Sequence, residues 1–534
     1  MKEASDERQG SEGQPRATRH APRATLGVRR LADALLPNEL ARLTTEDFAA
    51  FLIPRRWFGA KAGKPTSARV RDVIPLPWEG GRFVIARLEV TTETSPGAPK
   101  LYQLPLSLRT TDEIGDTPPK GVIARVVGDD GEGLLFDAVE DRGFLRALGD
   151  AVARDADYAG DRAHWTIEPL SANSLVVPPT AEIRVGSVEQ SNTSVILGEQ
   201  AILKLFRKLE PGAQPDVELT RFLTMDAEFP HTPSLLGVVR FEDGDQETVA
   251  GMLQEYLPKS VDAWAYALDC ARPYFKAPKN REVPNPFLAD AERLGFVTRA
   301  MHEALAQGTS PDFAPEPAAP ELVDQWAGRA KQWVRDGLVL LERQLRGRVL
   351  PKERAPEAEA LARRADQYIG TVDEIVNTIR GDTGYAIRIH GDYHLGQVLR
   401  TARDDFMVID FEGEPARPLA ERREKASPLR DVAGMLRSFA YAAATLGMEA
   451  KGLDLGTREL RVGRWERDTR DAFMRGYLAS RKSETRILPS DPEHTRALLR
   501  LFETEKAFYE LAYELNNRPD WTWIPMRGIA KLLA

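Results

Sequence analysis

The strongest chemical signal in the sequence is one loop that carries two of the chain's seven histidines and an aspartate. It reads Ile389-His390-Gly391-Asp392-Tyr393-His394-Leu395-Gly396-Gln397. An apolar run, Val408-Ile409, then ends in Asp410, 18 residues after Asp392. Phosphoryl transfer from ATP needs one carboxylate that accepts the proton of the attacking hydroxyl and a second that holds Mg²⁺ against the phosphates. The pattern therefore predicts Asp392 as the general base and Asp410 as a Mg²⁺ ligand.

A side-chain amide in the same loop strengthens this interpretation. Gln397 follows Asp392 by five residues, a place usually taken by Asn in kinases, and it is predicted as the second Mg²⁺ ligand. The alternative is a solvated loop with a capping Asp. The joint occurrence of acid, amide and strand-end acid favours a kinase.

The phosphate-pairing lysine of a kinase should lie upstream on a strand. Ala201-Ile202-Leu203-Lys204 has that form, and Glu218, 14 residues later on a predicted helix, is the candidate ion-pair partner of Lys204. The alternative is an edge-strand lysine and an exposed helix glutamate.

The predicted hairpin before Lys204 lacks a Gly-x-Gly run and carries Glu189-Gln190-Ser191-Asn192-Thr193-Ser194 instead. Hydroxyls, an amide and turn N–H groups of Ser191, Asn192, Thr193 and Ser194 could contact phosphate oxygens. The segment from Gln254 through Tyr256 to Leu257 lies where a kinase hinge would bind adenine. Taken alone, the loop 189–194 is a weak signal for phosphate binding. The segment 254–257 is equally consistent with an ordinary connection.

These groups must be positioned by a chain of 534 residues, which is too long for one ordinary core and predicts two or three packed units. Turn signals separate short β-type runs, which are expected to pair antiparallel. A helix is expected after them, with Asp216 as a plausible N-cap. Beyond residue 258 the pattern is overwhelmingly helical. The β-type runs are 69–76, 83–90, 102–108 and 122–127, a hairpin is expected over 195–206, and helices are expected from Leu31 to Leu43, from Phe48 to Ile53 and from Asp216 to Met225.

Composition excludes several classes of protein. A formal net charge of −8 argues against a nucleic-acid binder, and the single cysteine, Cys270, excludes an internal disulfide framework and a multi-thiolate zinc site. The sequence lacks an apolar run of membrane-spanning length. Residues Met1 to Thr25 have almost no apolar side chains and lack the apolar core of a secretion signal, so a disordered tail and a cytoplasmic protein are expected.

Several long motifs together resemble the maltokinases, bacterial enzymes related to the aminoglycoside phosphotransferases. The resemblance covers nearly everything from about residue 30 to the end, and in it the glycine-poor phosphate loop is normal. The matching segments are Arg56 to Gly59, Gln190 to Ser194, His390 to Leu399, Ile409 to Pro415, Ser427 to Gly434 and Glu505 to Glu514.

The resemblance implies ATP-dependent phosphorylation of the anomeric hydroxyl of maltose, giving maltose 1-phosphate for α-glucan and glycogen synthesis. The maltose would often come from trehalose, which makes trehalose synthase a possible functional partner. Carried over by position, Lys204 contacts phosphates, Glu218 holds it, and His390 lies at the sugar-binding edge. Tyr393 stands where many members have Leu. The family also has an N-terminal cap, which matches residues 30–100.

A possible sugar site can be read from helical spacing. Lys506, Tyr509, Glu510 and Tyr513 share one helical face and offer the flat and polar surfaces that a disaccharide needs. Such a stripe is more often core, but the resemblance implies that it binds maltose. Arg527 is a further candidate.

Two other segments are expected to be structural. The basic-aromatic cluster Arg55 to Lys61 could contact nucleic acid, but in an acidic protein Trp57 and Phe58 are expected to fill the core of the cap. The segment Ser427 to Gly434 is expected to cap a helix that supports the catalytic loop, with Arg430 and Asp431 as an ion pair.

The sequence as a whole predicts an α+β, bilobal kinase-like fold with a β-rich N-terminal lobe, a cap and a helical C-terminal lobe. The expected segments are a tail (1–29), the cap (30–110), an intermediate region and N-lobe (111–257) and the C-lobe (258–534). The predicted function is an ATP- and Mg²⁺-dependent maltose kinase. The alternatives are a kinase for glucosamine or another sugar, whose ammonium Glu505 or Glu510 could bind, and a non-catalytic scaffold for a glucan-pathway enzyme.

Overall fold

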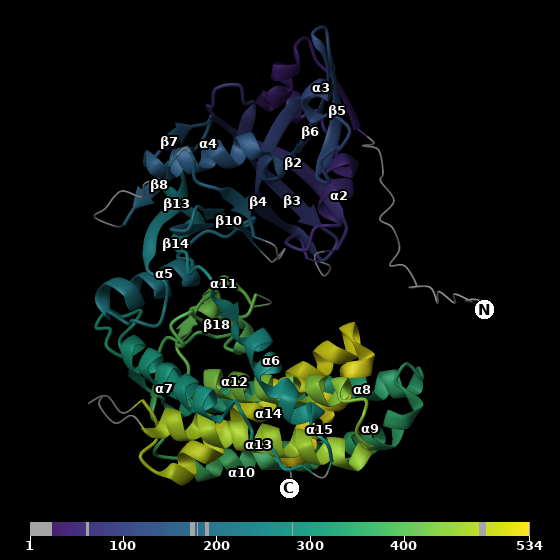
Figure 1. Cartoon of the computed structure of the whole chain (residues 1–534), viewed down its shortest axis with the longest axis vertical. Coiled ribbons are helices and arrows are strands. Elements are labelled where there is room, and N and C mark those ends of the chain that lie inside the picture. Colours follow the sequence, from purple (N-terminus) through teal and green to yellow (C-terminus); the bar gives the residue numbers. More distant parts are fainter. Residues whose placement is uncertain are drawn as a thin grey trace, which may run out of the picture. The chain divides into compact units, whose positions relative to one another are not determined.

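The structure is a computed structural model of the chain, and its described residues fall into two compact units (Figure 1). None of the helices in the described part is both long and apolar enough to cross a lipid bilayer. Unit 1 comprises Met1–Gly198, Ile202–Pro211 and Val238–Met252, and unit 2 comprises Glu199–Ala201, Gly212–Gly237 and Leu253–Ala534. The described residues are 24–59, 63–170, 177–178, 180–186, 192–279, 281–415, 417–479 and 487–532.

The first sheet has the strand order β1-β5-β6-β4-β3-β2, with β12 paired to β4. β2, β3 and β4 pair antiparallel as predicted, whereas β1 joins β5 in parallel. Strand β1 lies within the predicted tail, so the prediction of disorder was wrong for these residues. Residues 1–23 lie outside the described part. The strands are β1 (Ala24–Gly27), β2 (Pro65–Leu76), β3 (Phe83–Thr92), β4 (Ser95–Thr110), β5 (Val122–Gly128), β6 (Gly131–Asp137) and β12 (Lys208–Leu209).

The second sheet has the strand order β7-β8-β13-β14-β11-β10-β9. Its neighbours β10 and β11 are the predicted hairpin, and β11 carries Lys204. The strands are β7 (Asp157–Ala159), β8 (His164–Pro169), β9 (Ile183–Val185), β10 (Thr193–Leu197), β11 (Ala201–Leu205), β13 (Leu235–Asp243) and β14 (Gln246–Glu255).

The helices of unit 1 are short, and the apolar residues Leu31 to Leu43 do not form one continuous helix. A 3₁₀ turn, Leu31–Leu35, precedes α1 because Pro37, which suits a first helical position, starts a new helix there. The helices are α1 (Pro37–Leu40), α2 (Thr45–Leu52), α3 (Thr111–Ile114) and α4 (Arg142–Ala153).

The basic-aromatic cluster contributes to the core of unit 1. Trp57 and Phe58 are buried, and their ring centroids lie 6.1 and 5.5 Å from the ring of Tyr102. The guanidinium of Arg207 lies 5.1 Å from the Trp57 ring centroid. The prediction that Trp57 and Phe58 fill a core is confirmed. Lys61 lies outside the described residues.

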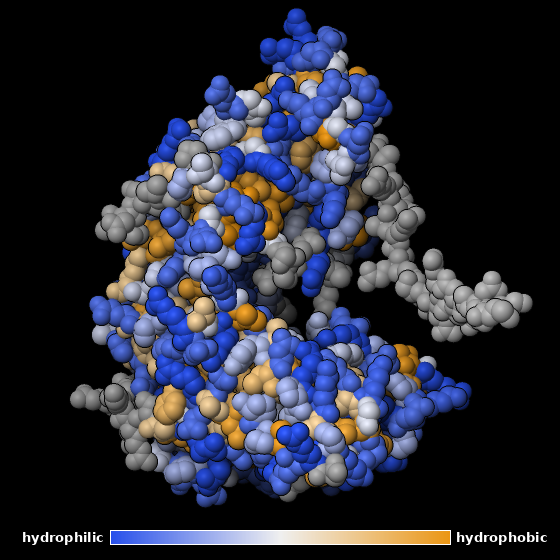
Figure 2. All heavy atoms as spheres, viewed as in Figure 1, coloured by the Kyte–Doolittle hydropathy of each residue, from blue (hydrophilic) through white to orange (hydrophobic). Residues whose placement is uncertain are grey.

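Unit 2 is mainly helical, as the sequence after residue 258 predicts. Figure 2 shows polar side chains over much of the surface seen in that view, with apolar residues scattered between them. The helices are α5 (Pro215–Arg221), α6 (Ala263–Lys276), α7 (Leu288–Leu305), α8 (Pro320–Arg346), α9 (Ala355–Ala362), α10 (Ala365–Thr378), α11 (Leu419–Arg422), α12 (Leu429–Glu449), α13 (Leu455–Ala479), α14 (Pro492–Asn517) and α15 (Trp523–Leu532). The short strands are β15 (Val261–Asp262), β16 (Glu316–Pro317), β17 (Tyr385–Ala386), β18 (Val398–Arg400) and β19 (Phe406–Val408).

Helix α5 differs from its prediction at both ends. Gln214 is the N-cap, and its side-chain oxygen accepts a hydrogen bond of 2.8 Å from the Asp216 N–H. Proline is favoured at the first helical position, which here is Pro215. The helix then widens into a π-helical turn, Phe222–Asp226. Asp216 therefore lies inside the helix rather than at its N-cap.

Helices α7 and α13 approach backbone to backbone through two glycines. A Cβ atom on Gly476 of α13 would overlap the carbonyl oxygen of Glu292 on α7, and one on Gly295 of α7 would overlap the carbonyl oxygen of Phe473. Only glycine leaves room for this packing.

We expect Gly476→Ala to lower the free energy of unfolding by roughly 1–3 kcal/mol, because the methyl group has no space against the neighbouring backbone. Gly328→Ala is the matched control, since the position is helical and exposed and a Cβ there meets nothing within 4 Å. It should be neutral or stabilising by up to about 1 kcal/mol. Chemical denaturation of both variants tests the packing, and equal stability would contradict it.

Candidate active site

The predicted catalytic loop lies between β17 and β18, and Asp431 in the first turn of α12 hydrogen-bonds its backbone. One carboxylate oxygen of Asp431 accepts the His390 N–H at 2.8 Å, and the other accepts the Gly391 N–H at 2.9 Å. Gly391 has a φ of +83°, a left-handed conformation that glycine adopts at little cost. Asp431 thereby fixes the backbone immediately before Asp392.

A buried histidine completes this support. His302 of α7 hydrogen-bonds Asp431 at 3.2 Å through Nε2 and the Tyr477 hydroxyl at 2.9 Å through Nδ1. Burial would raise the pKa of Asp431, but the hydrogen bond and charge of His302 and the loop N–H groups lower it overall. The carboxylate therefore stays ionised as the acceptor that the loop needs.

The segment around Asp431 supports the catalytic loop as predicted, but the predicted Arg430–Asp431 ion pair was wrong. Arg430 donates to Glu505 of α14 at 2.8 Å, whereas Asp431 binds the loop and His302. Consecutive helical residues point about 100° apart, so the two side chains reach different neighbours.

Asp392 lies beside a lysine. Its Oδ1 is 3.6 Å from the Lys506 Nζ, and its side chain is 23% exposed, so it can meet a substrate. Burial would lower the pKa of Lys506, but the charges of Asp392, Glu414 and Glu510 raise it overall. Lys506 is therefore a fixed cation next to the predicted base.

The strand pair β18–β19 brings the two predicted metal ligands to one end of a hairpin. Val398 is in register with Val408, and one step further the Ile409 N–H donates to the Gln397 carbonyl at 3.0 Å. Asp410 follows directly, with a φ of +69°, a conformation that is rare outside glycine, Asn and Asp. Gln397 and Asp410 are thus neighbours, as their predicted roles require.

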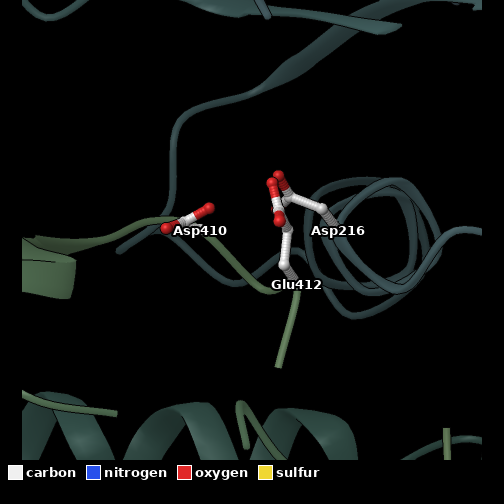
Figure 3. A group of neighbouring side chains, drawn as sticks. All are labelled: Asp216, Asp410 and Glu412. Carbon is white, nitrogen blue, oxygen red and sulfur yellow. The ribbon is translucent and has the colours of Figure 1, made fainter. Parts of the chain in front are cut away.

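Two further carboxylates gather at Asp410 (Figure 3). Oxygen atoms of Asp216, Asp410 and Glu412 lie within 4.8 Å of one another. Asp216, fully buried on α5, also accepts the Phe411 N–H at 2.8 Å and so holds the turn after Asp410. Carboxylate and amide oxygens are the ligands that hard divalent cations prefer, so this donor set fits Mg²⁺. The sequence analysis did not single out Asp216 or Glu412 as ligands.

Glu218, the predicted partner of Lys204, is bound by two arginines within unit 2. Its carboxylate accepts from Arg388 at 2.8 Å and from Arg423 at 2.7 and 3.1 Å. Burial would raise the pKa of Glu218, but these two guanidiniums lower it overall. A pairing with Lys204 is not supported by these contacts and remains only a prediction.

The predicted phosphate loop is described in part. Ser191 lies outside the described residues, Asn192 is buried, and Ser194 is half-buried on β10. The Thr193 hydroxyl accepts a hydrogen bond of 2.7 Å from Arg207, which also pairs with Asp137 at 2.9 Å. Thr193 therefore joins a buried network of unit 1, and the phosphate contacts of Asn192, Thr193 and Ser194 stay predictions.

The predicted adenine-binding segment has two backbone donors already in use. The Glu255 N–H donates to the Ser234 carbonyl, and the Tyr256 N–H donates to the Gln200 carbonyl, both at 2.9 Å. Gln254 is 8% exposed, and its buried amide Nε2 finds no hydrogen-bond acceptor among the described residues. Its side chain is therefore a donor that a ligand could use, and adenine binding by this segment stays a prediction.

The predicted sugar face of α14 is divided between a pocket and a buried ion pair. Lys506 and Tyr509 line a pocket with Asp392, and the Tyr509 ring packs edge-on to Trp333 of α8 at 5.1 Å between centroids. Burial raises the pKa of Tyr509, and its hydrogen bond to Glu414 raises it further. Trp333 and Glu414 were not predicted as site residues, because Trp333 in particular is remote in sequence from every motif.

The remaining residues of the predicted sugar site lie elsewhere. Glu510 is buried against Arg437 at 2.7 and 2.8 Å, and Tyr513 is 40% exposed one turn further along α14. His390 is 1% exposed and hydrogen-bonds the Ile409 carbonyl at 3.0 Å, so its ring is structural rather than at a sugar-binding edge. Arg527 lines a different cavity, between α13 and α15, because α15 packs away from this pocket.

Comparison with known proteins agrees with this geometry. A glucosamine kinase of Streptacidiphilus jiangxiensis is 26% identical over 367 residues, which are 68% of this chain and 76% of that protein. A glucosamine kinase of Mycolicibacterium smegmatis is 29% identical over 351 residues, 65% of this chain and 78% of that one. Residues 51–141 match the family model of the maltokinase N-terminal cap domain. These similarities support a sugar kinase.

Solved structures define the fold of this sugar kinase. A glucosamine kinase in complex with glucosamine, ADP and inorganic phosphate has a TM-score of 0.61 at 21% identity, covering 93% of this chain and 99% of that one. Crystal form B of a glucosamine kinase has a TM-score of 0.62 at 22% identity, with coverage of 92% and 99%. The predicted α+β, bilobal kinase-like class is confirmed.

Proposed function

We propose that this sugar kinase transfers the γ-phosphoryl group of ATP to the anomeric hydroxyl of maltose and releases maltose 1-phosphate. The observation that carries the choice of acceptor is the charge pairing in the pocket at Asp392. Three carboxylates of this pocket each lie beside a cation, an arrangement that suits a neutral sugar. The pairs are Asp392 with Lys506, Glu414 with Arg417 and Glu505 with Arg430. The motif resemblance and the match to the maltokinase cap support the same acceptor.

Asp392 is the proposed general base. It is partly exposed, its loop is fixed by Asp431, and the Lys506 ammonium lies 3.6 Å from its carboxylate. An ionised carboxylate can accept the proton of the sugar hydroxyl as that oxygen attacks the γ-phosphorus and the bond to the ADP oxygen breaks.

The phosphates and the metal need separate groups. Lys204 is proposed to contact the phosphates with Asn192 and Ser194, and Gln397 and Asp410 are proposed to hold Mg²⁺. Glu412 and Asp216 lie close enough to Asp410 to share in that task. The metal, when bound, neutralises charge on the transferred phosphoryl group.

The pocket's charges explain why a neutral acceptor is favoured over glucosamine. Glu505 pairs with Arg430 at 2.8 Å, and Glu414 pairs with Arg417 at 3.0 Å. A glucosamine ammonium would therefore share the pocket with the Lys506 ammonium, and like charges so close repel. Glu510, another candidate to bind an ammonium, lies outside the pocket and is paired with Arg437.

Two orphaned polar groups indicate a ligand with hydroxyls. Glu505 Oε2 and Arg430 Nη2 are buried without a hydrogen-bond partner among the described residues. Sugar hydroxyls can donate to the first and accept from the second, which would satisfy both. The aromatic rings of Tyr509 and Trp333 border these groups and offer apolar surface to the C–H faces of a sugar ring.

A coupled ADP-release assay with Mg-ATP and maltose, glucose, glucosamine or trehalose tests the proposal. We expect a kcat/KM for maltose at least roughly tenfold above that for glucosamine, since a mispaired charge costs more than 1.4 kcal/mol. A preference for glucosamine would establish the alternative, which the names of the relatives favour and for which Glu505 Oε2 is the available acceptor. Absence of turnover with every sugar would favour a scaffold. Coupling to trehalose synthase and glycogen synthesis belongs to the same proposal and depends on the maltose result.

A further inference from the structure

A second cavity lies in unit 2 among helices α12, α13, α14 and α15. Its volume is about 830 Å³. Its lining includes Arg437 of α12 and two residues of α14, Glu503 and Ala507. The latter two lie on α14, which presents Lys506 and Tyr509 to the sugar pocket instead. The two cavities therefore use different faces of one helix.

The lining of this cavity is rich in arginine. It contains six arginines and one lysine against four carboxylates, and three of the arginines, Arg437, Arg464 and Arg467, also pair with carboxylates outside the lining. Two of the carboxylates are already paired, Glu503 with Arg470 at 2.7 Å and Glu466 with Lys531 at 2.7 Å. Guanidinium groups bind phosphate oxygens, like carboxylate oxygens, in a planar two-bond geometry, so this lining suits a phosphate.

The pKa values of two residues that line the cavity, Glu466 and Lys531, respond to the neighbouring arginines. Burial would raise the pKa of Glu466, but Lys531, Arg437 and Arg470 lower it overall. Burial lowers the pKa of Lys531, and Arg527 and Arg470 lower it further against the pull of Glu466. The neighbouring arginines therefore act on both groups, with burial as the first cause of the lowered pKa of Lys531.

Three arginines leave donors available. Arg437 is 4% exposed and donates to Glu510 through Nε and Nη2, while its Nη1 makes no hydrogen bond among the described residues. That Nη1 occupies the place of a side chain on Gly528, which also lines the cavity. On α14, Arg500 donates to the carbonyl of Leu532, which carries no charge. Arg496, one turn earlier, has no ion pair within the described part of the chain.

We propose that this cavity is a binding site for a phosphorylated small molecule, held by Arg437, Arg496 and Arg500 and separate from the catalytic centre. The volume accommodates a sugar phosphate or a short phosphate chain. Both kinds of ligand carry a phosphate dianion or polyanion, which accepts several hydrogen bonds from guanidinium groups. The proposal does not depend on the acceptor sugar of the kinase.

Calorimetric titration of the full chain with inorganic pyrophosphate and, separately, glucose 6-phosphate tests the site. Lys204→Ala weakens the proposed catalytic phosphate site, so the part of the remaining binding that also depends on Arg496 and Arg500 is assigned to the second site. Arg496→Ala/Arg500→Ala should then weaken that binding roughly tenfold or more. The control Arg346→Ala/Arg475→Ala removes two exposed arginines that do not line the cavity, and it should leave the affinity within about twofold.

Comparison of the cavity variant with its control decides between the outcomes. Binding of either compound that the cavity variant loses and the control retains supports the site, and the compound that binds more tightly identifies the source of the phosphate. Absence of binding in Lys204→Ala, or equal affinity in the cavity variant and its control, overturns the proposal. Arg496→Glu, a single change at an exposed position, gives the same test if the double variant fails to fold, and thermal melting establishes folding beforehand.

Discussion

Asp392→Asn should lower kcat for sugar phosphorylation by roughly 10²–10⁴-fold, the range expected for loss of a general base. The substitution keeps the size of the side chain and removes the charge that accepts the proton. Asp392 makes one ion pair of 3.6 Å with Lys506 and is partly exposed, so the fold should tolerate the change. Steady-state kinetics with the preferred sugar and calorimetry with ATP are the two measurements.

Binding of ATP should be unchanged in Asp392→Asn, because the proposed phosphate contacts come from other residues. Asp404→Asn is the matched control, since Asp404 lies in the nearby β18–β19 turn with its side chain 92% exposed and has the φ of +59° that Asn also tolerates. It should retain full activity. A variant at Asp392 that keeps more than a tenth of the wild-type kcat would exclude this residue as the base.

Asp431→Asn should reduce both turnover and stability, although Asp431 is 1% exposed and touches no substrate. The carboxylate accepts two loop N–H groups and His302, and an amide cannot accept all three. We expect kcat to fall roughly 100-fold as Asp392 loses its fixed position. The free energy of unfolding should fall by roughly 1–3 kcal/mol, because a buried hydrogen-bond donor is left without its acceptor.

A graded control separates positioning from general damage. Tyr477→Phe removes the hydroxyl that contacts His302 at 2.9 Å and leaves all three partners of Asp431 in place. It should cost about 1 kcal/mol of stability, the usual worth of a neutral hydrogen bond, with kcat within a few-fold of wild type. If both variants lost activity only in proportion to their lost stability, Asp431 would have no separate positioning role.

The catalytic loop could be predicted because its chemistry is contiguous in sequence. Asp392, Gln397 and Asp410 fall within 19 residues, and a short hairpin is enough to bring the last two together. The alternation of β-type strands and the change to helices after residue 258 follow from local periodicity in the same way. Local patterns therefore accounted for the fold class and for the core of the candidate site.

What the sequence could not provide is the orientation of helices that are distant along the chain. Asp216 and Glu218 lie two positions apart on α5, which turns them about 200° from each other. The sequence favoured Glu218 for a catalytic pairing, but Asp216 joins Asp410 while Glu218 binds Arg388 and Arg423. The same limit concealed Trp333 and the support of Asp431 by His302, because each depends on packing between separate helices.

The central claim is that the anomeric hydroxyl of maltose is the phosphoryl acceptor. Its most direct test is phosphorus NMR of the product formed from maltose and Mg-ATP, together with an assay of reducing sugar. The account predicts a phosphorus signal coupled to the anomeric proton and loss of reducing ends in step with ADP release. A phosphorylated product that still reduces, or no product from maltose while glucosamine is phosphorylated, would contradict it.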